Sequence, residues 1–181
     1  MPGGDDVIEY HSLDAPQPGW RMHDTSESGC RLVSQSHEAA RQKLGGVLGI
    51  QDEADDRWKI GIVRRLKKLA GGRIELGIEL IAVHSLLVST KPVNVRDTGY
   101  SVDGIDASSG SRGFDALYLP PHSAGREAPQ RSLLVPAAEY GEGRRLLLDL
   151  GSTAYTVEFA LPLERSKDWV WTTFAVVSRT D

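Results

Sequence analysis

Apolar and polar residues alternate strictly along residues 73–81 of this 181-residue chain. One set of positions holds branched apolar side chains, Ile74, Leu76, Ile78 and Leu80, and the positions between them hold charged residues or glycine. A period of two places these side chains on one face of a strand. Residues 58–63 alternate in the same way, and the glycines at 71 and 72 can adopt the positive φ angles of a tight turn. The pattern predicts a β-hairpin over residues 58–81.

Shorter segments of the same kind recur along the chain, separated by turn-forming residues. The further candidate strands are residues 20–23, 29–34, 47–51, 86–90, 116–119, 132–136, 145–150, 153–161 and 169–177. Residues 36–44 alone have a helical composition, and that segment is short. Because no helix is long enough for a βαβ unit, the pattern predicts an all-β protein.

Composition divides the chain into four parts. Residues 1–19 contain three prolines, four acids and no Lys or Arg, which indicates an arm or linker. Residues 20–94 hold the first group of strands and predict a β-barrel. Residues 95–114 are rich in Gly, Asp and Ser and read as a linker or long loop. Residues 115–181 predict a second small β-barrel or sandwich.

Net charge and composition argue against several classes of function. A formal net charge of −4 and a pI near 5.7 argue against a nucleic-acid partner on the scale of the whole chain. Cys30 is the one cysteine, so no intramolecular disulfide is expected, and no apolar run is long enough to span a membrane. We expect a cytoplasmic protein.

Chemistry-bearing residues form no recognisable catalytic or metal-binding motif. The five histidines are scattered, without cysteines or carboxylates at metal-ligand spacing. Gly141-Glu142-Gly143 lacks the third glycine and the helix of a dinucleotide site and is read as a turn. We therefore expect no enzyme activity, no metal and no cofactor.

The six residues from Asp24 to Gly29, read Asp-Thr-Ser-Glu-Ser-Gly, lie between two predicted strands. They resemble the second ligand motif of PilZ domains, Asp/Asn-x-Ser-x-x-Gly, with Leu32 a few places on. The segment Glu-Leu-Gly-Ile-Glu-Leu at residues 75–80 is similar to a later PilZ strand, with Leu80 in place of an aromatic residue. The resemblance covers roughly residues 20–90 and implies a PilZ-like split or Greek-key β-barrel.

The same resemblance implies cyclic di-GMP as a ligand and protein contact as the output. Asp24 would accept from the Watson–Crick edge of guanine, Ser26 would donate to a phosphate or base oxygen, and Gly29 would let the backbone approach the ligand. PilZ receptors also carry an Arg-x-x-x-Arg motif before the barrel, which is missing from this chain. Arg21 and Arg31 are the nearest candidates to replace it.

Three readings of the function follow. In the first, the chain is a non-catalytic PilZ-like signalling module that binds cyclic di-GMP and contacts a partner protein. In the second, it is a degenerate PilZ-like scaffold that binds no nucleotide, and residues 24–29 form an ordinary turn. In the third and weakest, the basic segment 57–73, with Lys59 and Arg65 expected on one strand face, binds RNA.

Two tryptophan positions are also open to more than one interpretation. Trp169 and Trp171 should lie on the same face of a strand, where core packing is favoured over a partner-binding surface. Trp20, near the candidate ligand loop, could cover a ligand or plug the barrel.

Overall fold

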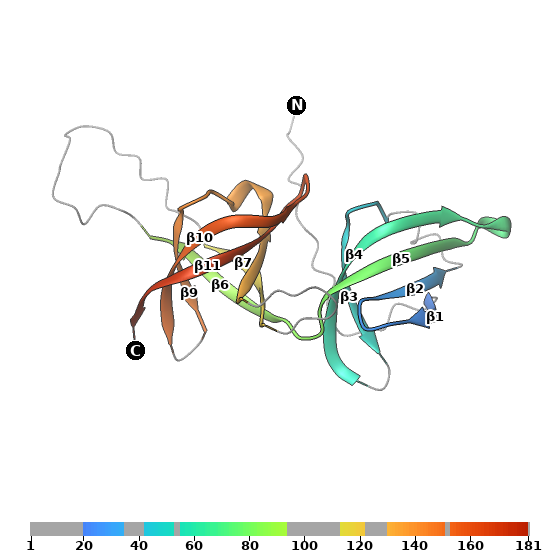
Figure 1. The fold of residues 1–181 in the computed structure, drawn as a ribbon, viewed down its shortest axis with the longest axis horizontal. Helices are drawn as coiled ribbons and strands as arrows, with labels where there is room; N and C mark the ends of the chain where they lie inside the picture. The colour runs from blue at the N-terminus through green and yellow to red at the C-terminus, as the bar shows by residue number, and fades with distance from the viewer. Residues whose placement is uncertain are drawn as a thin grey trace, which may run out of the picture.

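The computed structural model describes residues 20–34, 42–52, 55–93, 113–121, 130–150 and 153–180, and within these ranges the chain is built from strands and two short 3-10 turns. The all-β prediction is confirmed. The strands form two units, which lie side by side in Figure 1. The predicted helix at residues 36–44 falls mostly outside the described residues.

The first unit is a five-stranded antiparallel sheet. Its strands are β1 (Trp20–Thr25), β2 (Gly29–Ser34), β3 (Val47–Asp52), β4 (Asp55–Lys68) and β5 (Ile74–Ala82). Their spatial order is β1-β2-β5-β4-β3, so β5, β4 and β3 form a meander and β2 returns beside β5 in Greek-key fashion. The predicted hairpin is β4 and β5, and both turn glycines adopt positive φ, 73° at Gly71 and 74° at Gly72.

The second unit is a closed barrel of six strands. These are β6 (Leu86–Pro92), β7 (Phe114–Leu119), β8 (Ser132–Pro136), β9 (Arg145–Asp149), β10 (Ala154–Arg165) and β11 (Trp169–Thr180). Hydrogen bonding runs around the barrel in the order β10-β11-β8-β7-β6-β9 and returns to β10. The segment at Gly141–Gly143 is a turn, in which the Arg144 N–H donates to the Gly141 carbonyl at 3.0 Å.

Strand β6 belongs to the second unit by its pairing, which differs from our expectation that residues 86–90 end the first barrel. It pairs on one side with β7 and on the other with β9. Val88 and Thr90 are buried, and the Thr90 hydroxyl donates to the Phe114 carbonyl at 2.7 Å. Local alternation identified the strand, but its partners lie far along the chain. The other expected boundaries remain predictions.

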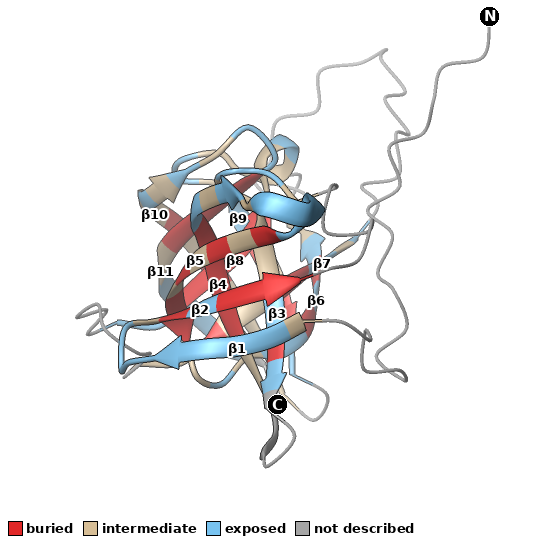
Figure 2. Cartoon of the chain, turned by 90° about the vertical axis from the view of Figure 1, so that its right-hand side faces the viewer, coloured by how far each residue is buried: buried red, intermediate tan, exposed pale blue. Residues whose placement is uncertain are grey.

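The two units share one strand order. The first sheet runs β1-β2-β5-β4-β3, and the barrel contains the corresponding series β7-β8-β11-β10-β9. Strand β6 is the additional element, and it closes the barrel because it pairs with both β7 and β9. No described strand takes the equivalent place between β1 and β3, so the first unit is a curled, open sheet rather than a closed barrel within the described residues. Figure 2 shows β1 as an exposed strand at its rim.

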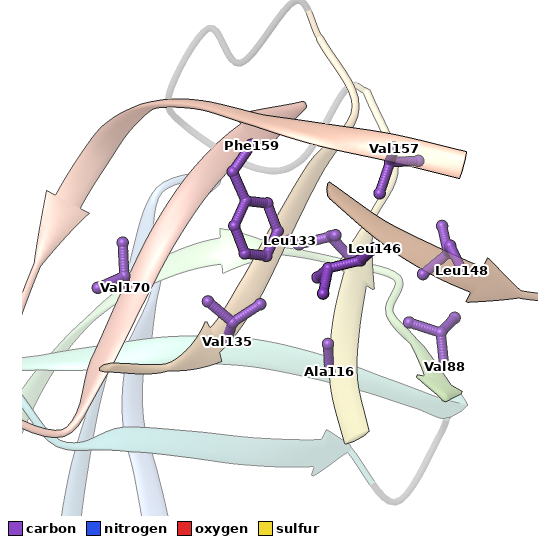
Figure 3. Close-up of a cluster of buried hydrophobic side chains, with 9 residues drawn as sticks. All are labelled: Val88, Ala116, Leu133, Val135, Leu146, Leu148, Val157, Phe159 and Val170. Atoms are coloured by element: carbon purple, nitrogen blue, oxygen red, sulfur yellow. The ribbon is translucent and has the colours of Figure 1, made fainter. Parts of the chain in front are cut away.

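Each unit has its own apolar core. One face of the first sheet buries the side chains predicted by the alternation in β5, together with residues of β2, β3 and β4: Cys30, Leu32, Ile50, Val63, Ile74, Leu76, Ile78 and Leu80. The barrel interior is filled by the nine side chains drawn in Figure 3, Val88, Ala116, Leu133, Val135, Leu146, Leu148, Val157, Phe159 and Val170.

A third buried cluster joins the units. The outer face of the first sheet packs against the outer wall of the barrel through Ile60, Ile62, Ile81, Ala82, Leu119, Leu134, Trp169 and Trp171. The two tryptophans share a strand face, as predicted, and both are buried. The Trp169 indole N–H donates to the Gly45 carbonyl at 2.8 Å, across the junction. The tryptophan pair is therefore core, and the surface that it covers belongs to the same chain.

Ion pairs surround this shared core. The Arg64 guanidinium donates two hydrogen bonds to the Glu164 carboxylate, at 2.5 and 2.6 Å, and one to Glu79 at 2.6 Å. Its pKa is raised above the usual value, chiefly by the hydrogen bonds that it donates to Glu164. Lys43 contacts Asp168 at 2.5 Å and lowers the pKa of that carboxyl. The contacts of Arg64 with Glu164 and of Lys43 with Asp168 join the two units at the edge of their buried contact.

Candidate functional site

The turn between β1 and β2 carries Ser26 and Gly29 of the predicted ligand motif. The Ser26 N–H donates to the Gly29 carbonyl at 2.8 Å, and the Ser26 hydroxyl donates to the same oxygen at 3.2 Å. Ser26 therefore closes the turn through its own backbone and side chain. Its hydroxyl oxygen keeps lone pairs that can accept a further hydrogen bond.

Gly29 is required by the packing of the sheet. A Cβ at this position would lie 2.5 Å from the Ile78 carbonyl oxygen of β5, which is closer than nonbonded atoms can approach. The neighbouring Ser28 carbonyl accepts from the Leu80 N–H at 2.9 Å, so β5 holds the turn directly. The glycine of the motif thus has a structural role that no ligand is needed to explain.

Asp24 and Arg31 are brought together by the register of the hairpin. They are directly opposite one another on β1 and β2, and therefore project from the same face of the sheet. The register shifts between Met22 and Asp24, so that His23 is an extra residue in β1. Because of this bulge, Arg21, which is opposite Val33, lies on the same face as Asp24.

That face is the outer one, opposite the core of the first unit. Leu32 and Cys30 alternate with Arg31 and point into the core, where burial raises the pKa of the Cys30 thiol and nearby Lys59 lowers it by a smaller amount. Asp24, Arg21 and Arg31 are exposed. Three of the five predicted ligand residues thus share one solvent-facing surface, and the turn with Ser26 and Gly29 lies at its end.

Strand β5 continues this surface across the sheet. Arg31 is directly opposite Gly77 of β5, and Gly77 is directly opposite Arg65 of β4. The row Asp24, Arg31, Gly77, Arg65 therefore crosses four neighbouring strands on one face. Gly77 and Arg65 were absent from the predicted site because their place in the row depends on the pairing of β2 with β5, which the sequence pattern does not specify.

Lys59 and Arg65 do not share a face, contrary to our expectation. The register of β4 shifts between Val63 and Arg65, where Arg64 is an additional residue. The bulge moves Arg65 to the outer face, whereas Lys59 lies on the face of the first core. The expected paired cationic contact to RNA is therefore wrong for these two residues.

Acidic residues balance part of the positive charge on the outer face. Glu75 lies 3.8 Å from the Arg31 guanidinium and is directly opposite Lys67. Glu79 pairs with Arg64 at the border with the barrel. Among the described residues, the ion pairs of this face include neither Arg21 nor Arg65, and they do not include the Asp24 carboxylate. Two cationic groups and one carboxylate therefore have no ion-pair partner there.

Trp20 lies away from the candidate ligand turn. It is opposite Ser34, whereas the turn follows the Thr25–Cys30 pair at the other end of the hairpin. Its ring is partly buried against the first core. The structure therefore supports the interpretation that Trp20 plugs the first unit, and not the interpretation that it covers a ligand.

A shallow hollow lies on the second barrel, away from this surface. It has a volume of about 390 Å³ and is lined by Pro92, Val93, Gly143, Arg144, Arg145 and Glu158. Its two arginines are already paired, Arg144 with Glu139 at 3.0 Å and Arg145 with Glu158 at 2.7 Å. The hollow therefore offers few free polar groups to a ligand.

The described ranges contain neither a cluster of metal-ligating side chains nor a helix that could span a membrane. No group of three or more His, Cys, Asp or Glu residues there is placed to hold a metal ion. None of the helical segments in the same ranges has the length and apolar character needed to cross a bilayer.

The first unit is similar to a known protein family. Residues 10–86 match the model of the family described as the middle PilZ domain of the cyclic-di-GMP receptor FimW. The match spans less than half of the chain, includes all of β1 to β5, and ends at the first residue of β6. No curated protein and no solved structure matches the chain significantly. The resemblance seen in the sequence is confirmed.

Proposed function

We propose that this chain, whose residues 10–86 match the family model of a PilZ domain of a cyclic-di-GMP receptor, is a cytoplasmic, non-catalytic receptor for cyclic di-GMP that signals through contact with a partner protein. Asp24, Ser26 and Gly29 form the base-recognising part of the site. Arg21 and Arg31 supply the positive charge that the Arg-x-x-x-Arg motif supplies elsewhere in the family.

The observation that carries this proposal is the shared face of Asp24, Arg21 and Arg31 at the end of the β1–β2 hairpin. A carboxylate accepts from the ring N–H and the exocyclic amine of guanine, and guanidinium groups bind phosphate oxygens or stack on bases. The three residues combine these two chemistries on a solvent-facing surface.

Protein contact as output is supported by the close joining of the two units. The sheet that carries the site packs through its outer face on the barrel, and Arg64 links the border of that face to Glu164 of β10. A change of state at the first unit can therefore alter the surface that both units present to a partner.

Calorimetric titration of the full chain with cyclic di-GMP tests the proposal, with cyclic di-AMP and GTP as ligand controls. We expect selective binding to the wild type and its loss in Asp24→Ala. Glu142→Ala, which removes an equal charge from an exposed turn of the second barrel, should bind as the wild type does. Unchanged affinity of Asp24→Ala would contradict the assignment of that residue.

A second candidate is a PilZ-like scaffold that binds no nucleotide. It is favoured by the turn geometry, because turn closure and sheet packing already account for Ser26 and Gly29. The absence of Arg-x-x-x-Arg from the sequence supports it as well. No binding of cyclic di-GMP to the wild-type chain would make this the preferred function.

A further inference from the structure

Gly77 leaves a gap in the side chains of the outer face, with an arginine on either side of it. Arg31 of β2 and Arg65 of β4 are each directly opposite Gly77 of β5. The two arginine backbones are thus two strand spacings apart, roughly 10 Å. Both arginines are exposed, with 49% of the Arg31 side chain accessible. Long side chains can close most of that gap from both sides.

The side chain of Arg65 lies over Gly77. A Cβ added to Gly77 would be 3.1 Å from Cβ of Arg65, 3.9 Å from its Cδ and 4.0 Å from its Cγ. Because Gly77 has no side chain, the aliphatic part of the Arg65 side chain can pack directly against the backbone of β5. The Arg65 side chain, as far as its Cδ, thus lies beside the backbone of β5.

The charges around this pair leave Arg65 available. On this face Arg31 has Asp24 directly opposite and Glu75 at 3.8 Å, and Lys67 is also opposite Glu75. Arg64 is occupied by Glu79 and Glu164. The Arg65 side chain forms no ion pair or hydrogen bond within the described residues, so its guanidinium is available to bind an anion.

We propose that Arg31 and Arg65, on either side of Gly77, form a phosphate-binding pair. Each planar guanidinium can donate two parallel hydrogen bonds to phosphate oxygens. The inference deepens the proposed function and rests on it: Asp24 and the adjoining turn recognise a guanine base, and the phosphates of the dinucleotide lie along the row toward β4. Arg65 would then be the distant replacement for the missing arginine motif.

The test uses the full chain and two probes, cyclic di-GMP and inorganic pyrophosphate. In calorimetric titrations, Arg65→Gln should weaken binding of both probes by roughly tenfold or more, the scale of a lost charge-assisted hydrogen bond. Arg65→Lys should recover only part of the loss because an ammonium lacks the planar fork. Lys68→Gln is the matched control: it removes the same charge from the same strand, but Lys68 is opposite Ile74, on the other face of the sheet.

Gly77→Ala is a second, independent variant. Its new methyl group displaces the Arg65 stem without removing any charge, so it should also weaken binding of pyrophosphate. Thermal unfolding of each variant shows whether it is folded at the temperature of the titration, so that only folded variants are compared. If Arg65→Gln and Lys68→Gln bound cyclic di-GMP and pyrophosphate with the same affinity, the proposed phosphate pair would be wrong.

The outcomes separate this inference from the proposed function. If the wild type binds cyclic di-GMP and loses it in Asp24→Ala but not in Arg65→Gln, the receptor function stands and the phosphate pair falls. If the wild type does not bind cyclic di-GMP, the receptor function fails. Pyrophosphate binding that depends on Arg65 would then support the pair alone, and the absence of pyrophosphate binding would overturn it too.

Discussion

The two units of this chain follow the same strand order, yet one is open and the other is closed. The barrel has β6 between β7 and β9, whereas no described strand lies between β1 and β3 of the first sheet. In the barrel every strand has two neighbours, so its backbone groups are satisfied within the unit. The open sheet keeps two edges and an outer face that reaches solvent beyond the barrel contact. The closed barrel is therefore suited to support, and the open first sheet is suited to recognition. Strand β6 makes the difference between them.

The location of the candidate site agrees with this difference. The cationic row lies on the open sheet, and the arginines lining the hollow of the closed barrel are paired with glutamates. The barrel in turn covers the apolar part of the outer face of the sheet through Trp169 and Trp171. We interpret the barrel as the element that supports the first sheet.

The largest expected contrast between the units is in native-state hydrogen exchange. Outward-pointing amides of edge strand β1 should exchange roughly 100-fold faster or more than those of β6, because edge groups exchange by local opening and a strand paired on both sides needs wider unfolding. Mass spectrometry with peptide-level resolution measures this. Equal protection of β1 and β6 would mean that the edge is covered in solution, and the contrast would disappear.

Removing the buried tryptophan at the junction should sharply destabilise both units together. Trp171 is 1% exposed, and its indole N–H donates to the Ser132 hydroxyl at 2.9 Å. Trp171→Ala should lower the free energy of unfolding by about 3–5 kcal/mol, the usual cost of truncating a buried Trp. Urea unfolding followed by circular dichroism measures the change.

The control for this variant is Leu161→Ala, since Leu161 is 67% exposed and should change stability by less than about 0.5 kcal/mol. Two well-separated transitions in the wild type would show that the shared core does not couple the units.

A smaller effect is expected from a methyl group added at the ligand turn. Gly29→Ala forces a clash with the Ile78 carbonyl and should cost about 1–3 kcal/mol of stability. Gly141→Ala is the matched control in the barrel, because its Cβ would meet Arg144 at an ordinary 3.6 Å. The two midpoints of thermal unfolding can be compared directly. If Gly29→Ala were as stable as Gly141→Ala, the glycine of the motif would have no structural role.

Strand positions were largely predictable from the sequence because period-two alternation is a local property. The alternation in 73–81 predicted β5, and the two glycines before it predicted the turn. The partners of a strand are not local. Residues 86–90 were identified as a strand but assigned to the wrong unit, since the pairing of β6 with β9 joins segments more than fifty residues apart.

The site was predictable only as a set of residue types. The spacing from Asp24 to Gly29 identified the motif, but the facing positions of Asp24 and Arg31 depend on the bulge at His23. Gly77 and Arg65 enter the row through the register of the sheet, which alternation does not determine. A bulge shifts every later side chain to the opposite face, and neither bulge has a recognisable sequence signal here.

The bulge at Arg64 is a position where strand β4 could lose or gain one residue. Val63 and Arg65 are opposite the consecutive residues Ile78 and Gly77, so Arg64 has no partner of its own in the ladder. Removing its codon would leave a regular strand with every other side chain on its present face, and would delete the ion pairs of Arg64 with Glu79 and Glu164. Insertion or loss of one codon could therefore add or remove this ionic link between the two units during evolution, while their buried apolar contact is kept.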